Sequence, residues 1–226
     1  MRTMPAMLGF QRDGLCVVAA GLVVGAVLLP AERVQVRPTL AEASMAREVT
    51  LDGTGSWTVS DGILSLVTAG KPAGPIRRPS ALAIVASPDL ADVTLDVDVR
   101  STAALPAVTP RRDALLVVGY QSPTKFYYVH LSAARDEVHN GIFLVNDADR
   151  KRIDSRSDVT PLVDQAWHHA RLVRVIATGR IEVYVDDRPE PIMVATDSTL
   201  TWGRIGVGSF DDTAEFRRVV VEGTTR

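Results

Sequence analysis

"VTLDVDVR", residues 93–100, decides the fold because its apolar and polar residues alternate strictly. In an extended chain every second side chain points to the same side, so one side of this stretch is apolar and the other polar. The apolar side consists of Val93, Leu95, Val97 and Val99. This period of two is typical of a β-strand that packs one face on a core and exposes the other to water.

The same pattern recurs on both sides of this stretch. Residues 57–68, "WTVSDGILSLVT", predict a β-hairpin whose turn is Ser60-Asp61-Gly62. Further strands are predicted at 82–86, 113–121, 125–131, 138–145, 152–154, 167–176, 180–186, 192–195, 204–209 and 215–222. Loops rich in Pro and Gly, such as residues 69–75, separate them. About a dozen short strands predict an all-β domain built as an antiparallel β-sandwich.

The composition fits one globular domain and excludes several classes of function. The chain has 226 residues, of which 46% are hydrophobic, enough for one substantial core. The formal charge is −2, from 25 basic and 27 acidic residues, and no basic stripe is present, so a nucleic-acid partner is not expected. The single cysteine, Cys16, rules out an internal disulfide framework and a Cys-rich zinc site.

The N-terminal segment differs from the rest of the chain. Arg2 and Arg12 precede an uncharged apolar run at residues 15–29, "LCVVAAGLVVGAVLL". The run is short for a membrane span and suits the apolar region of a secretory signal. Residues 1–30 are therefore predicted to be a signal peptide or a short membrane anchor, 31–46 a tether, and 47–226 the sandwich domain. We expect an exported protein, periplasmic or extracellular, with membrane contact only through the N-terminal segment.

Several motifs, in order, carry a resemblance to a known superfamily. They are "WTVSDGIL" (57–64), "WHHARL" (167–172), "GRIEVYVD" (179–186), "GRIGVG" (203–208) and "FRRV" (216–219). Together they resemble the concanavalin A-like lectin/glucanase superfamily, and most closely bacterial exported domains of the laminin-G-like and 3-keto-disaccharide hydrolase (DUF1080-like) kind. The resemblance implies a jelly roll in which one concave sheet forms the ligand groove. It leaves the activity open, since the superfamily includes lectins, hydrolases and lyases.

The candidate site is the polar stretch "FYYVHLSAARDEVHNGIFLVNDADR", residues 126–150. If strands 126–131 and 138–145 pair around a loop at 132–137, His130 faces His139 across the hairpin. In the leading hypothesis, a lectin-like domain binds a glycan here: a tyrosine ring stacks on a sugar, imidazole and amide groups bond its hydroxyls, and Arg150 pairs with a uronate or sulfate. The candidate ligand-binding residues are Tyr128, His130, His139, Asn140, Asn146 and Arg150. A polar hairpin with a purely structural role explains the same residues.

Two other functions remain open at this stage. The first is a glycoside hydrolase or lyase acting on a (3-keto-)disaccharide or polysaccharide, with His130 or His139 as general base. The second is a structural module that assembles with other envelope proteins. Glu182 and Asp186 are the carboxylate pair with a spacing suited to retaining glycoside hydrolysis, but the alternation around them favours a solvated strand face.

The sequence requires no cofactor, but two groups of residues offer ligands for a metal ion. His130 and His139 together with Asp136 or Glu137 offer ligands for a divalent ion. Asp211 and Asp212 fall in a predicted turn, and related folds bind structural Ca²⁺ through such loops. An ordinary turn, in which an Asp side chain bonds the local backbone, explains the second pair equally well.

Overall fold

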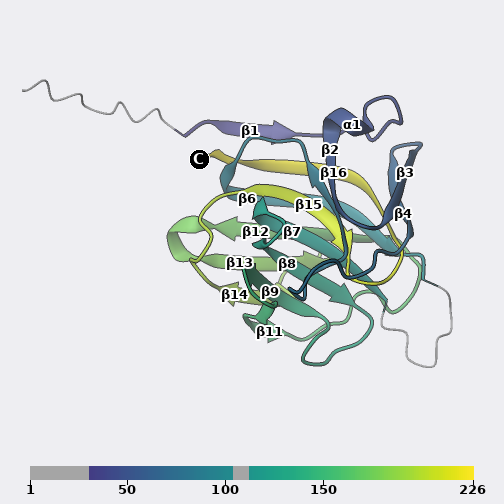
Figure 1. Ribbon diagram of the computed structural model, residues 1–226. Coiled ribbons are helices and arrows are strands. Elements are labelled where there is room, and N and C mark those ends of the chain that lie inside the picture. Colours follow the sequence, from purple (N-terminus) through teal and green to yellow (C-terminus); the bar gives the residue numbers. More distant parts are fainter. Residues whose placement is uncertain (1–30, 104–111) are drawn as a thin grey trace, which may run out of the picture. The chain divides into compact units, whose positions relative to one another are not determined.

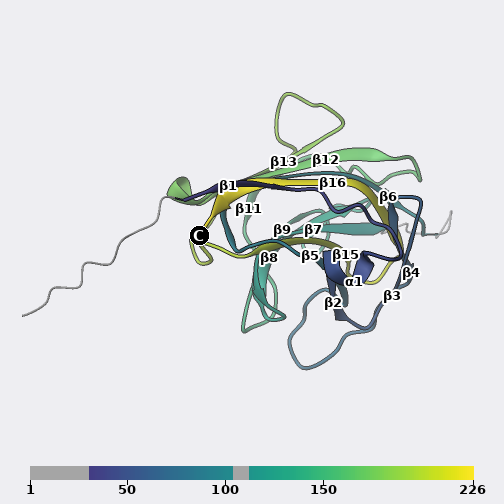
Figure 2. The ribbon, with the colours of Figure 1, turned by 90° about the horizontal axis from the view of Figure 1, so that it is seen from above.

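The computed structural model describes residues 31–103 and 112–226, which form two antiparallel sheets packed face to face (Figure 1; Figure 2). The predicted all-β sandwich is therefore confirmed. The nine-stranded sheet contains, in spatial order, β11 (Asp154–Ser157), β14 (Met193–Thr196), β13 (Arg180–Val185), β12 (His168–Val175), β6 (Leu90–Ser101), β16 (Ala214–Thr225), β4 (Ile63–Thr68) and β3 (Ser56–Ser60), and β1 (Arg33–Val36) also pairs with β16. The seven-stranded sheet contains β10 (Lys151–Arg152), β9 (Gly141–Asn146), β8 (Lys125–Ser132), β7 (Asp113–Ser122), β15 (Arg204–Ser209), β5 (Ala81–Val85) and β2 (Val49–Gly53).

Strand β6 lies inside the nine-stranded sheet, between β12 and β16. Its four alternating apolar side chains are at most 4% exposed and face the core between the sheets. On the other face Asp98 departs from the prediction, because it is only 2% exposed. Arg217 Nε donates to its carboxylate at 3.1 Å, and His169 Nδ1 lies 3.3 Å away. The polar face of β6 is thus covered by ion pairs from the neighbouring strands.

The predicted hairpin at residues 57–68 is present as β3 and β4. Its turn residues Asp61 and Gly62 both have a positive φ, 53° and 74°. Two successive residues in this region form the turn whose twist matches that of paired strands, and Asp-Gly is a favoured pair for it. The local sequence therefore favours this turn, and the pairing of β4 with β16 adds tertiary support to the hairpin.

Residues 31–46 belong to the folded unit, which extends over Ala31–Arg226. Strand β1 pairs with the C-terminal part of β16, and Leu40 is 2% exposed. The short helix α1 (Met45–Glu48) follows, and Glu48 accepts hydrogen bonds from the backbone N–H groups of Thr39 (3.0 Å) and Leu40 (2.9 Å). The segment expected to be a tether is therefore attached to both the sheet and the core.

The predicted signal or anchor at residues 1–30 lies outside the described residues. Among residues 31–103 and 112–226, no helix is both long and apolar enough to span a bilayer.

The seven-stranded sheet is apolar on both faces. One face packs on the nine-stranded sheet, and we call the opposite one the outer face. The outer face carries a second cluster of buried apolar side chains: Leu82, Ile84, Leu115, Val117, Tyr120, Phe126, Tyr128, Phe143 and Val145. We call this set the outer-face cluster.

Leu95→Ala is expected to lower the free energy of unfolding by about 2–5 kcal/mol, because it leaves a cavity at a fully buried position of β6. Urea denaturation followed by circular dichroism measures the change. Thr94→Ser, at the adjacent position on the solvent side, is the control and should cost about 1 kcal/mol or less. Equal losses in the two variants would contradict the assignment of the two faces.

Candidate functional site

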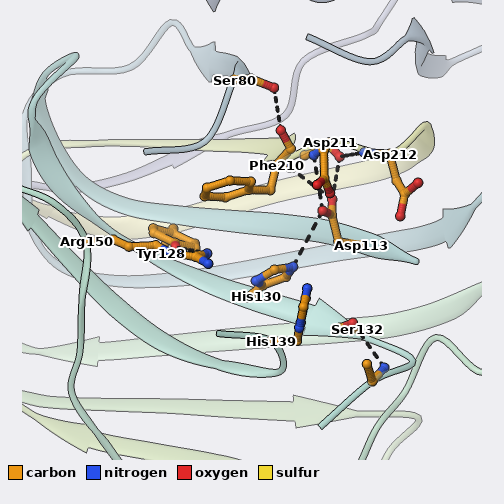
Figure 3. A network of polar contacts seen from close by, with 12 residues as sticks. Ser80, Asp113, Tyr128, His130, Ser132, His139, Arg150, Phe210, Asp211 and Asp212 are labelled. Atoms are coloured by element: carbon orange, nitrogen blue, oxygen red, sulfur yellow. Dashed lines mark hydrogen bonds and ion pairs between the residues drawn. The ribbon is translucent and has the colours of Figure 1, made fainter. Parts of the chain in front are cut away.

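The candidate site lies at one end of the outer face. Asp113 is the first residue of β7, and His130 lies near the end of β8. The register places Asp113 opposite Ser132, two residues from His130, so the period of two puts Asp113 and His130 on the same face. Both side chains are buried, and His130 Nε2 lies 3.5 Å from Asp113 Oδ2 (Figure 3). This buried acid–imidazole pair is the centre of the site.

The loop after β15 holds the carboxylate of Asp113. Asp113 accepts hydrogen bonds from the backbone N–H groups of Phe210 (3.0 Å) and Asp211 (3.2 Å) and from the hydroxyl of Ser209. A buried charge is strongly destabilising unless such donors compensate it. Asp113 therefore fixes the position of this loop at the end of the sheet.

The carboxyl groups of Asp113 and Asp211 have pKa values shifted in opposite directions. Burial favours the neutral form of Asp113, but the neighbouring His130 and the Ser209 hydroxyl outweigh it and lower its pKa to about 2. Burial, followed by the nearby charge of Asp113, raises the pKa of Asp211 to about 6. The same two causes raise the pKa of Asp212. Near neutral pH the site thus holds one permanently ionised carboxylate beside an exposed one that changes its charge.

The loop between β8 and β9 brings His139 beside His130, with ring centroids 5.4 Å apart. Asp136 accepts two backbone N–H groups of its own loop at 2.9 Å, and its Oδ1 lies 2.7 Å from His139 Nδ1. The predicted proximity of the two histidines is confirmed. A row of carboxyl and imidazole groups therefore runs along this end of the sheet, from His139 through His130 to Asp113 and Asp211 (Figure 3). Asp136, paired with His139, extends this row.

The predicted strand register in this hairpin was wrong. His130 pairs with Gly141, not His139, because β9 begins at Gly141 and residues 133–140 form the connecting loop. Asn140 has a φ of 50°, which interrupts the extended chain, and Arg152 donates to the carbonyl groups of His139 (3.2 Å) and Asn140 (3.0 Å). These contacts replace strand pairing at the positions where pairing was expected.

Tyr128 does not offer an exposed ring in the structure. It is fully buried, and its ring stacks on Phe143 with centroids 5.1 Å apart. Its hydroxyl accepts a hydrogen bond from Arg150 Nη1 at 2.9 Å. The expectation that Tyr128 stacks directly on a sugar is thus contradicted by its burial. The partly exposed Arg150 lies above it, and its contact with a ligand stays a prediction.

Asn140 and Asn146 lie away from this row of groups. Asn140 is buried and donates from Nδ2 to Ser157 Oγ (3.1 Å) and to the Val159 carbonyl (2.8 Å), so its amide holds the next segment of chain. Asn146 is exposed at the far end of β9, where it pairs with Lys125. Of the six predicted ligand-binding residues, the structure brings His130 and His139 together, places Tyr128 and Arg150 next to them, and separates both asparagines.

Phe210 was missed by the sequence analysis. The residue is partly buried, its ring stacks on His130 with centroids 6.2 Å apart and planes at 11°, and the Arg150 guanidinium lies 4.2 Å from its centroid. Asp113 was also missed, because it is 97 residues from Phe210 and no local motif links the two. A signal for Asp113 was present, since a carboxylate at the start of an apolar strand needs buried donors.

The carboxylate pair considered for hydrolysis is engaged elsewhere. Arg180 Nε donates to Glu182 at 2.6 Å, and the Tyr184 hydroxyl donates to it at 2.9 Å. Asp186 lies 2.7 Å from His168 Nδ1. These ion pairs agree with the solvated strand face that the sequence favours.

Asp113, Asp211 and Asp212 fit a divalent cation by chemistry. Each offers one carboxylate oxygen, and these oxygens lie within 4.8 Å of one another. Carboxylate oxygens are the ligands that Ca²⁺ prefers, and a cation would relieve the repulsion that raises the pKa of Asp211. Asp211 and Asp212 would hold the ion from the solvent side. Since Asp113 already accepts three hydrogen bonds, Ca²⁺ stays an expectation to be tested.

Comparisons with known proteins show a fold. No family model matches the sequence, and no curated protein matches it. Among solved structures, the carbohydrate-binding module CBM66 from Bacillus subtilis has 18% identity and a TM-score of 0.58, over 78% of this chain and 97% of that one. Lectin I-B4 from Griffonia simplicifolia has 10% identity and a TM-score of 0.56, over 85% and 100%. Winged bean acidic lectin complexed with methyl-α-D-galactose has 12% identity and a TM-score of 0.54, over 86% and 100%.

These similarities confirm the concanavalin A-like jelly-roll fold predicted from the sequence. At such low identities they do not extend to activity. The narrower resemblance to laminin-G-like and DUF1080-like domains stays a prediction.

Asp113→Asn is expected to lower the pKa of Asp211 from about 6 toward the ordinary value of 3.8, because the neighbouring negative charge is removed while the side-chain shape is kept. A ¹³C NMR titration of the carboxyl groups measures the pKa of Asp211 in the unmodified protein and in Asp113→Asn. Asp61→Asn, an exposed change in the β3–β4 turn, should leave Asp211 unaffected. An Asp211 pKa that is ordinary in the unmodified protein, or unmoved in Asp113→Asn, would contradict the described cluster.

Proposed function

We propose that this protein is an exported, lectin-like carbohydrate-binding protein that contacts a sugar at the end of the outer face where His139, Phe210 and Asp211 converge. We call this end the sugar site. The single observation that carries the proposal is a partly buried aromatic residue at the surface, Phe210, surrounded by hydrogen-bonding groups of both charges.

The chemistry of the sugar site suits a pyranose or furanose ring. Sugars present apolar C–H faces that pack on aromatic rings and hydroxyls that bond charged side chains. Phe210 supplies the ring. The Asp211 carboxylate accepts hydrogen bonds from sugar hydroxyls, and the Arg150 guanidinium donates hydrogen bonds to sugar oxygens. His139 lies at the margin, 8% exposed. Tyr128 and His130 support these groups from beneath, and Arg150 adds affinity for a uronate or sulfate.

The similar structures support the proposal through what their names state. One is a carbohydrate-binding module, and two are lectins, one of them bound to methyl-α-D-galactose. Export is part of the proposal because residues 1–30 have the charge and apolar pattern of a signal or anchor. Fractionation of cells that express the tagged chain tests it, and a purely cytoplasmic protein would contradict export.

A hydrolase or lyase is the second candidate, and one observation favours it. The site pairs an ionised carboxylate, Asp113, with Asp211, whose raised pKa of about 6 keeps it partly protonated near neutrality. Environments that push two pKa values apart are typical of acid–base sites. Asp211 would then act as the general acid, with His130 or His139 as general base. Mass spectrometry of incubated glycans and oxidised disaccharides tests this activity.

Asp211→Asn is expected to weaken glycan binding roughly tenfold to hundredfold, because a hydrogen bond to a charged group contributes about 1.5–3 kcal/mol. The purified full chain is screened on a glycan array, with added Ca²⁺ and with chelator, and hits are quantified by calorimetry. Phe210→Ala should also weaken binding, whereas Asp61→Asn, the matched exposed control, should not. Absence of binding to any glycan under both conditions would contradict the proposal and favour a structural module.

Binding is expected to strengthen as pH rises through about 6, because the pKa of Asp211 is about 6 and its ionised carboxylate accepts stronger hydrogen bonds from sugar hydroxyls than its protonated form does. Calorimetric titrations between about pH 5 and pH 8 measure the trend. In Asp211→Asn this pH dependence should disappear. A pH-independent affinity in the unmodified protein would exclude Asp211 as the titrating acceptor.

A further inference from the structure

The outer face is covered along most of its length by the chain itself. The nine apolar side chains of the outer-face cluster are at most 6% exposed, although they point away from the sandwich core. Residues 69–80 connect β4 to β5 and cross this face (Figure 1; Figure 2). The side chain of Ile76 packs against the cluster. We call residues 69–80 the strap.

The strap is stiff and firmly attached where it enters and leaves the sheet. Three prolines, Pro72, Pro75 and Pro79, limit its backbone freedom and so reduce the entropy lost when it is ordered. The backbone N–H of Lys71 donates to Thr54 Oγ1 at 2.6 Å, and the N–H of Thr54 donates to the Ser80 carbonyl at 2.9 Å.

A second attachment joins the strap to the sheet that it covers. Arg78 forms a two-pronged ion pair with Asp52, at 3.0 and 3.1 Å. The same carboxylate accepts the Tyr120 hydroxyl at 3.3 Å. Because Tyr120 belongs to the outer-face cluster, this contact ties the strap to the aromatic rings beneath it.

The tip of the strap reaches the opposite side of the sheet. The backbone N–H of Arg77 donates to Asp149 at 2.8 Å, and the N–H of Arg150 donates to the Arg77 carbonyl at 3.0 Å. Asp149 and Arg150 lie in the turn between β9 and β10, the last two strands at that edge, whereas Ser80 adjoins β5 near the other edge. The strap therefore lies across the strands.

The strap also borders the sugar site. The Ser80 hydroxyl donates to the Phe210 carbonyl, and the Arg77 guanidinium lies 6.0 Å from the centroid of the Phe210 ring. Arg150, held by the tip, lies 5.0 Å from the centroid of the Phe143 ring. Beyond Phe210, toward the middle of the sheet, no aromatic ring of the outer-face cluster is accessible.

We propose that the strap makes the sugar site specific for the terminal sugar of a glycan. The inference rests on the proposed function. A saccharide seated on Phe210 and Asp211 cannot continue along the strands, because the strap and its arginines occupy that space. The rest of the glycan must leave outward into solvent, so a sugar in the interior of a chain, which has neighbours on both sides, does not fit.

The number of protein molecules bound per glycan chain tests this inference. A linear glycan identified on the array is prepared in several lengths, and calorimetry with the unmodified full chain gives the stoichiometry. We expect one protein per chain at every length, and loss of binding when the recognised end is chemically capped. A stoichiometry that rises with length, or unchanged binding to capped chains, would overturn the inference while leaving the proposed function standing. No binding to any length would instead contradict the proposed function.

Shortening the strap provides the complementary test. Residues 71–76 are replaced by a short Gly-Ser linker, and near-UV circular dichroism checks the fold. We expect binding to capped chains to appear and the stoichiometry to rise with length, whereas Asp187→Ala, an exposed change on the other sheet, behaves like the unmodified protein. A folded variant that still requires a free chain end would contradict the role of the strap. If the variant does not fold, the stoichiometry of the unmodified protein decides.

Discussion

The structure depends on one constraint: the seven-stranded sheet is apolar on both faces. In β8, every residue from Phe126 to Ser132 is buried. A sheet with two apolar faces must be covered twice, since leaving either face in water would lose the hydrophobic free energy of a whole layer. The nine-stranded sheet covers one face. On the other, Ile76 of the strap packs against the cluster, and Arg150, Arg152 and Arg204 lie over its rings. What is left of the outer face for a ligand is its end.

That end is built around a buried charge. Asp113 is fully buried, its hydrogen-bond donors come from Ser209 and the loop that follows β15, and His130 lies 3.5 Å from its carboxylate. Because these donors must stay in place to compensate the charge, Phe210 and Asp211 are held at the surface in one arrangement. Burial of Asp211, and then the same charge, raises the pKa of Asp211. One buried carboxylate therefore determines the geometry of the proposed sugar site and contributes to its titration.

The fold could be predicted from the sequence because its signals are local. The alternation at residues 93–100 and the Asp61-Gly62 turn act over a few residues, and both are confirmed. The strand register was harder to predict from the sequence. Strand β9 starts at Gly141 because Asn140 and Arg152 form contacts that periodicity cannot show. The burial of Tyr128 comes with its stacking on Phe143 and its hydrogen bond to Arg150, contacts that the period of two does not show. The site was therefore predicted only in part, as the pair of histidines, without Asp113 and Phe210.

Mapping the glycan on the protein by NMR chemical-shift changes tests the central claim most directly. The account predicts that titration of a bound glycan moves the signals of His139, Phe210 and Asp211 and leaves those of Asn146 and of the solvent side of the nine-stranded sheet in place. Shifts concentrated at Asn146, or on β12 and β13 around Tyr184, would contradict the account and place the ligand elsewhere on the jelly roll.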